Sequence, residues 1–170
     1  GNLRKSFMKA FADFLVLFKT LPPSTTRSQS AWIAQGSSSM SGKVVLNFSD
    51  PAFGEKIFCH KKEGAWKYWF FGETVGGSFD TANIEKLNGN YCVLGLNSGS
   101  QEWHIWTNRL GTYHVYYAFD GKRAAIGTFF KSVADAASAK QLDWEGLTGF
   151  FSFGFFPQDK TWFQDVKILR

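Results

Sequence analysis

The chain has 170 residues, enough for one domain with a substantial core that needs no disulfide support. Hydrophobic residues make up 44% and aromatic residues 18%, including 19 Phe and 7 Trp. This composition excludes a disordered chain and predicts a rigid aromatic interior that needs no cofactor to explain it. The net charge of +5 comes from basic residues scattered along the chain, so we expect a solvated surface and no nucleic-acid partner.

Two cysteines and one apolar segment indicate the cellular compartment in which we expect the protein. Cys59 and Cys92 lie in apolar or strand-like runs without metal-binding spacing, so we expect free thiols, no metal and no disulfide framework. The apolar residues 11–18 are interrupted by Asp13, fall short of a membrane span, and precede no signal-peptide cleavage site. We therefore expect a cytoplasmic protein with no membrane partner.

The first part of the chain predicts one helix and one strand. Large apolar residues recur at helical spacing over residues 3–21, which indicates an amphipathic helix that Pro22-Pro23 stops. The polar stretches 24–30 and 37–41 predict loops, with a strand over residues 31–35 between them.

The middle of the chain is dense in predicted strands. Residues 79–87 predict a short helix with Asp80 or Thr81 as its N-cap. We expect the last four strands to form one antiparallel meander, with a hairpin turn at Asp120-Gly121. The strands are predicted over residues 43–48, 56–60, 66–71, 91–96, 103–107, 114–119 and 124–128.

The last part returns to helices. Residues 131–138 and 144–151 predict helices, the second with Asp143 as its N-cap, and residues 161–169 are expected to be extended. Helices flanking two strand-rich halves predict a single α+β domain over residues 1–170, with sheets inside and helices outside.

Several ordered segments resemble the class II glutamine amidotransferase domain of asparagine synthetase-like enzymes. The run from Asn108 to Tyr117 (Asn-Arg-Leu-Gly-Thr-Tyr-His-Val-Tyr-Tyr) is similar to that family's D-R-x-G-x-x-P-L-Y-Y. The family's L-D-x-E-x-L is matched by Leu142, Asp143, Glu145 and Leu147. Its closing T-x-F-x-x-I-x-x-L is matched by Thr161, Phe163, Val166 and Leu169.

The resemblance implies a four-layer αββα sandwich of the N-terminal nucleophile hydrolase type. It also implies that this is the front domain of a longer amide-forming enzyme, whose C-terminal synthetase domain would be its partner; a homo-oligomer and a free-standing small protein stay open. Within the resemblance we read Arg109 and Gly111 as structural, with Arg109 bridging loop carbonyls or a carboxylate and Gly111 taking a turn beside Asn108.

The chemistry that the resemblance calls for is missing. Glutaminases of this class use a cysteine at the very N-terminus, because its own α-amino group is the general base. Neither Cys59 nor Cys92 meets that condition. Gly1 has the look of a scar from tag cleavage, and we find no counterpart of the family's first strand, which carries Cys-Gly-Ile.

The implied glutamine pocket is also degenerate. Val45 stands where the family has an arginine for the glutamine α-carboxylate, and a valine offers no charge or donor. In Phe71-Gly72-Glu73, matching the family's N-G-E, phenylalanine replaces the side-chain amide of the oxyanion hole and leaves only the Gly72 backbone N–H. The segment that should hold an aspartate for the substrate amine is shortened and contains only Asp80.

We therefore expect a glutaminase-like domain without glutaminase activity or catalytic residues, serving as a scaffold or interaction domain. Two alternatives stay open. One is an active glutaminase whose cysteine lies upstream of Gly1. The other is a ligand- or partner-binding module in which Phe71, Trp69, Tyr91, Trp103 and His104 line an apolar cavity. Residues 150–156, five of them Phe, fit either an interdomain surface or the core.

Overall fold

The computed structural model describes residues 12–18, 24–27, 31–35, 42–48, 58–119 and 124–169, and the side chains of residues 14–17, 60–119 and 124–169. The strands are β1 Ala12–Phe18, β2 Ser24–Arg27, β3 Ala31–Gln35, β4 Gly42–Phe48, β5 Phe58–Glu63, β6 Trp66–Thr74, β7 Gly89–Asn97, β8 Glu102–Thr107, β9 Val115–Phe119, β10 Ala124–Gly127 and β11 Val166–Leu169. The helices are the 3₁₀ helix η1 Thr81–Lys86 and the α-helices α2 Phe130–Ala136 and α3 Trp144–Phe153.

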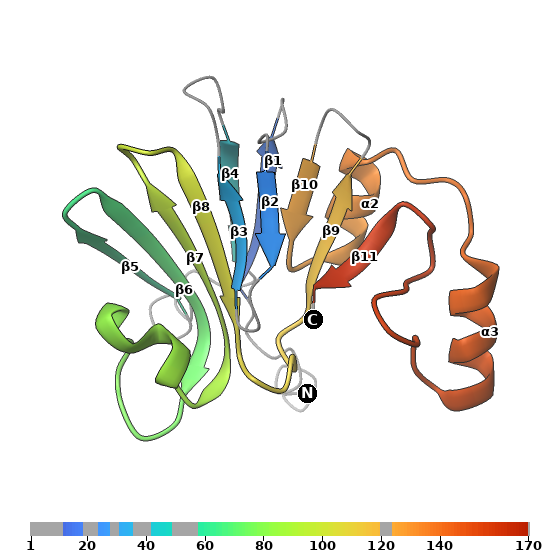
Figure 1. Ribbon diagram of the computed structural model, residues 1–170. Coiled ribbons are helices and arrows are strands. Elements are labelled where there is room, and N and C mark those ends of the chain that lie inside the picture. The colour runs from blue at the N-terminus through green and yellow to red at the C-terminus, as the bar shows by residue number, and fades with distance from the viewer. Residues whose placement is uncertain are drawn as a thin grey trace, which may run out of the picture.

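Two antiparallel sheets face each other (Figure 1). One has five strands in the order β11-β9-β10-β1-β4, and the other has six in the order β2-β3-β8-β7-β6-β5. The chain therefore folds as an α+β sandwich, as the sequence predicts.

The main core fills the space between the sheets. Strand alternation sends every second side chain into it. Phe14 and Val16 enter from β1, and Phe71, Leu94 and Trp103 enter from β6, β7 and β8. The opposite faces of both sheets are also partly buried, so the central strands carry apolar residues on both sides.

The helices cover the outer faces unevenly. Val133 and Ala134 of α2 pack on the outside of the five-stranded sheet. On the outside of the six-stranded sheet, η1 contributes Ile84 to a cluster with Phe70 and Val93. In Figure 1, α3 stands apart from both sheets, beyond β11.

The prediction of a helix over residues 3–21 is wrong for residues 12–18, which form β1. This strand lies between β10 and β4 in the interior of its sheet. Phe14 and Val16 face the main core, and Leu15 and Leu17 pack on the α2 side. A strand buried on both faces is apolar at nearly every position, so its residues can match helical spacing by chance.

Two other expectations are wrong because strand pairing depends on segments that are distant in the sequence. Residues 24–27, expected in a loop, form the edge strand β2 through pairing with β3, and a polar sequence is compatible with an edge. The expected four-strand meander is instead two hairpins, since β7 pairs with β8 in one sheet and β9 with β10 in the other. Periodicity predicts strands but does not identify their partners.

The remaining elements are close to the prediction. Asp80 caps η1 and Asp143 caps α3, as expected, while the extended C-terminal segment is a strand only over its last four described residues. Pro22-Pro23, the loop 37–41 and the hairpin turn at Asp120-Gly121 lie outside the described residues.

Candidate functional site

Phe71, expected in a degenerate glutamine pocket, lies in the core between the sheets. Its exposed fraction is 0%, and its ring centroid is 4.9 Å from that of Phe14 in β1. The place where the resemblance requires a side-chain amide is therefore filled by two packed rings, and no polar group of Phe71 is available to an oxyanion.

The other residues of the expected pocket are spread over both sheets. Val45 lies in β4 of the five-stranded sheet, paired with Leu15, whereas Gly72 and Glu73 follow Phe71 in β6. Glu73 is exposed to solvent. Gly72 has a φ of 111°, and a Cβ there would collide with the carbonyl oxygen of Asn90. This glycine therefore allows β6 and β7 to lie close together.

The five residues proposed from the sequence to line one aromatic cavity do not lie together in the fold. Trp69, Phe71 and Trp103 belong to or pack against the core between the sheets, and the Trp69 and Trp103 rings stack at 6.3 Å. Tyr91 lies in the cluster on the outer face of the six-stranded sheet, and His104 contacts Trp106. Alternation along strands places these five residues on opposite faces.

Asn108 organises the loop that carries the chain from one sheet to the other. Its side-chain Nδ2 donates to Thr112 Oγ1 at 2.7 Å, and its Oδ1 accepts from the Tyr113 backbone N at 3.2 Å. Its backbone carbonyl accepts from Gly111 N at 2.9 Å, which closes a turn in which Gly111 has a φ of 62°. The predicted turn at Gly111 is confirmed, and Asn108 is a buried structural residue.

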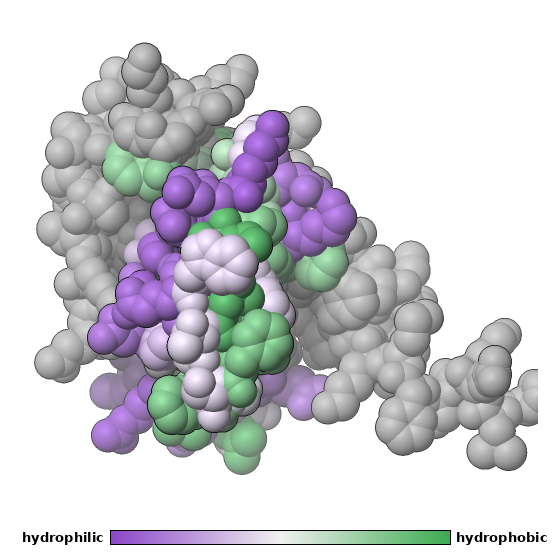
Figure 2. Space-filling model, turned by 90° about the vertical axis from the view of Figure 1, so that its right-hand side faces the viewer, coloured by the Kyte–Doolittle hydropathy of each residue, from purple (hydrophilic) through white to green (hydrophobic). Residues whose placement is uncertain are grey.

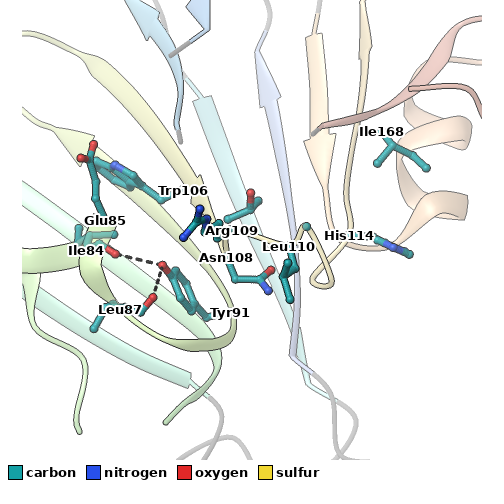
Figure 3. A pocket seen from close by; sticks show the side chains of 12 residues that line it. Ile84, Glu85, Leu87, Tyr91, Trp106, Asn108, Arg109, Leu110, His114 and Ile168 are labelled. Atoms are coloured by element: carbon teal, nitrogen blue, oxygen red, sulfur yellow. Dashed lines mark hydrogen bonds between the residues drawn. The ribbon is translucent and has the colours of Figure 1, made fainter. Parts of the chain in front are cut away.

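This loop forms one side of a cavity of about 680 Å³. Figure 3 shows side chains from η1, from the adjoining ends of β7 and β8, from His114 just before β9 and from Ile168 in β11 around it. Sequence reasoning missed this cavity because η1, the loop and β11 meet only in the folded chain. The lining residues are Ile84, Glu85, Leu87, Tyr91, Trp106, Thr107, Asn108, Arg109, Leu110, Gly111, His114 and Ile168.

The Tyr91 hydroxyl at the cavity already forms hydrogen bonds within the protein, whereas the Arg109 guanidinium does not among the described residues. The Tyr91 hydroxyl donates toward the carbonyl oxygens of Ile84 at 3.1 Å and Leu87 at 3.3 Å (Figure 3). Burial, together with the nearby Cys92 and Glu85, raises the pKa of this hydroxyl, so it remains a donor. Arg109 is exposed and has no hydrogen bond or ion pair among the described residues, so the bridging role expected for it is not seen there.

Neither a reactive cysteine nor a metal-binding cluster is found among the described side chains. The Cys92 thiol is fully buried and desolvation strongly raises its pKa, which makes it a poor nucleophile. Within residues 60–119 and 124–169, no three His, Cys, Asp or Glu side chains are grouped to hold a metal ion.

Of the helices that the structure describes, none has the length and apolarity to cross a bilayer.

A second feature of functional interest is a group of exposed aromatic side chains on α3 and the loop after it. Trp144, Phe151, Phe153 and Phe155 are exposed to 70%, 77%, 70% and 60%. Figure 2 shows this side of the molecule, where white-to-green surface is bordered by purple hydrophilic side chains. We call these four residues the α3 aromatic patch. The run of phenylalanines is thus divided, because Phe150 packs on Phe156 and Trp162.

No protein-family model matches this chain, and no curated protein matches it either. The function is therefore argued from the geometry of the fold, the buried contact of Phe71 with Phe14 and the exposed patch.

Proposed function

We propose that this chain is a glutaminase-like domain of the asparagine synthetase-related type, with the αββα architecture of N-terminal nucleophile hydrolases, that has lost glutaminase activity and serves as a scaffold and interaction domain. Two facing antiparallel sheets, with α2 outside one of them, support that architecture. Of the helices that the structure describes, only η1 packs on the outer face of the six-stranded sheet, so the second helical layer is reduced there.

The observation that carries the proposal is the packing of Phe71 on Phe14. An oxyanion hole needs preorganised donors about 2.7–3.1 Å from the developing charge, in a space that admits the substrate. Two aromatic rings 4.9 Å apart, with Phe71 fully buried, offer neither a donor nor space. The loss of function is thus built into the core and does not depend on one missing side chain.

Strand β1 is the natural counterpart of the family's first strand, since it is central in its sheet and brings Phe14 against Phe71. In this respect the proposal differs from the expectation that the strand is missing from the sequence. Its first residue, Ala12, has no nucleophilic atom, and its nitrogen is in a peptide bond to Phe11. A residue in this position supplies neither the thiol nor the free α-amino group that the reaction requires.

The α3 aromatic patch supplies the interaction surface in this proposal. Single exposed apolar residues are common on protein surfaces, but four exposed aromatic side chains on one short segment are typical of a contact surface. The partner is the C-terminal synthetase domain of the same polypeptide, and that domain selects the acceptor substrate. A reducing, cytoplasmic location is part of the proposal, supported by the free thiol of Cys92.

The proposal is tested with 6-diazo-5-oxo-L-norleucine, a glutamine analogue that alkylates glutaminase thiols. The protein is expressed from its natural start, incubated with the analogue, and its intact mass is measured. We expect no added mass. Alkylation of a cysteine would support the alternative, an active glutaminase whose nucleophile lies upstream of Gly1, and would overturn the proposal.

A further inference from the structure

The cavity at the loop from Asn108 to Gly111 is not used by the scaffold function. Its volume of about 680 Å³ falls within the range of small-molecule sites, roughly 300–1,000 Å³, and well above the space that a water molecule or an inorganic ion needs. Its walls come from both sheets and from η1, so the fold holds them in place.

Arg109 supplies the positive charge of the cavity, and its donors are free among the described residues. The Tyr91 hydroxyl and the Asn108 amide are occupied by the intramolecular hydrogen bonds described above. The exposed guanidinium of Arg109, in contrast, keeps all five N–H donors available in the part of the chain that the structure describes. A guanidinium fork with free donors matches the two oxygens of a carboxylate.

The apolar residues beside Arg109 indicate the shape and polarity of the rest of the ligand. Figure 3 places Trp106 and Tyr91 on the side of the cavity toward which Arg109 extends, with Leu87 below them. The half-buried Trp106 presents an indole ring on which a flat ring can stack. Glu85 lies on the same side, and its negative charge opposes a phosphate or another dianion more than it opposes a single carboxylate.

We infer that this cavity binds a small organic monocarboxylate with a flat, largely apolar body, its carboxylate on the Arg109 guanidinium and its ring against Trp106. The site is independent of the glutamine pocket, since Phe71, Gly72 and Glu73 do not line it. The domain then has a ligand of its own although its catalytic pocket is filled.

The test compares two probes with the same ring, indole-3-acetate and the neutral indole-3-acetamide. Binding is followed in ¹H–¹⁵N spectra through the indole Nε1–H signal of Trp106, assigned with the Trp106→Phe variant. A ligand of this size at ordinary efficiency binds with a Kd of about 1 mM, so the titration extends to tens of millimolar. We expect indole-3-acetate to bind at least tenfold more tightly than the amide.

Variants separate the role of Arg109 from general charge. Arg109→Gln should remove the preference for the carboxylate, and Arg109→Lys should keep part of it, since a lysine retains the charge without the fork. Lys86→Gln, the same change of charge on a residue that does not line the cavity, should leave both affinities unchanged. Equal binding of the two probes, no binding of either, or unchanged preference in Arg109→Gln would overturn the inference. Melting temperatures of the variants show that each is folded.

Discussion

The rings of Phe14 and Phe71 join the two sheets of the domain at a centroid distance of 4.9 Å, with their planes inclined by 38°. Phe14 comes from a central strand of the five-stranded sheet and Phe71 from a strand of the six-stranded sheet. Both side chains are almost fully buried. The contact thus contributes to the packing of the two sheets against each other.

Phe14→Ala and Phe71→Ala should each lower the free energy of unfolding by about 3–5 kcal/mol, because each removes a buried ring and leaves a cavity. The double variant should be less destabilised than the sum by about 1 kcal/mol, since the ring contact is lost only once. Urea denaturation measures all three. Phe119→Ala, at a position 54% exposed, is the control and should cost far less. Strict additivity would contradict a direct contact.

Gly111→Val should destabilise the domain by about 2 kcal/mol, because the φ of 62° at this position is unfavourable for a β-branched residue. Gly111→Asn should cost only a fraction of that, since asparagine tolerates left-handed conformations. No atom lies within 4 Å of the Cβ that would be added, so the difference between the two variants reports backbone strain. Equal melting temperatures for Gly111→Val and the parent protein would refute the turn.

Asp143 should make stability depend on pH below about 4. Burial alone would raise the pKa of this carboxyl, but the hydrogen bond from Gly146 N and the charges of Lys160 and Lys167 outweigh it and hold the pKa below its ordinary value. A carboxyl whose pKa is lower in the folded state stabilises the fold above the unfolded-state pKa of about 3.9 and loses this effect as pH falls through the folded-state value.

Two variants separate the cap of α3 from its charge. At pH 7, Asp143→Ala should cost about 1–2 kcal/mol, because it removes the N-cap, whereas Asp143→Asn keeps a capping oxygen and should cost less. Thermal unfolding from pH 7 down to pH 2 should show the difference between the parent protein and Asp143→Asn shrinking in acid. A difference that does not change over this range would contradict the ion pairs with Lys160 and Lys167.

Phe151→Ser and Phe153→Ser should change stability by less than about 0.5 kcal/mol, because both side chains are already exposed in the folded domain. Binding of a separately produced C-terminal domain, measured by calorimetry, should weaken at least tenfold. Phe150→Ser is the matched control for packing: this ring contacts Phe156 and Trp162, so the variant should lose stability. Unchanged binding in both surface variants would remove the α3 aromatic patch from the interface.

Local signals in the sequence were sufficient for much of the fold. Asp80 and Asp143 are capping residues followed by helical segments, and both cap as predicted. The strand over residues 31–35 has the predicted bounds, and the alternation in β6, with Trp69 and Phe71 inward and Phe70 outward, fits a strand between two apolar layers. These features depend on neighbours in the sequence, so a sequence can reveal them.

Features that depend on distant partners were missed. The apolar run of β1 matched helical spacing because this strand is buried on both faces. The division of four strands between two sheets depends on the loop around Asn108, whose hydrogen bonds to Thr112 and Tyr113 are visible only in the fold. The cavity beside Arg109 joins η1 to both sheets and has no contiguous signature in the sequence.

Release of ammonia from L-glutamine tests the central claim most directly. The protein, expressed from its natural start and at its natural length, is incubated with glutamine, and ammonia is measured beside the Phe71→Asn variant, which restores the amide expected in the family. We predict no release above background by either protein, because one amide supplies neither a terminal thiol nor space for substrate. Release by the parent protein that depends on enzyme concentration would contradict the proposed loss of glutaminase activity.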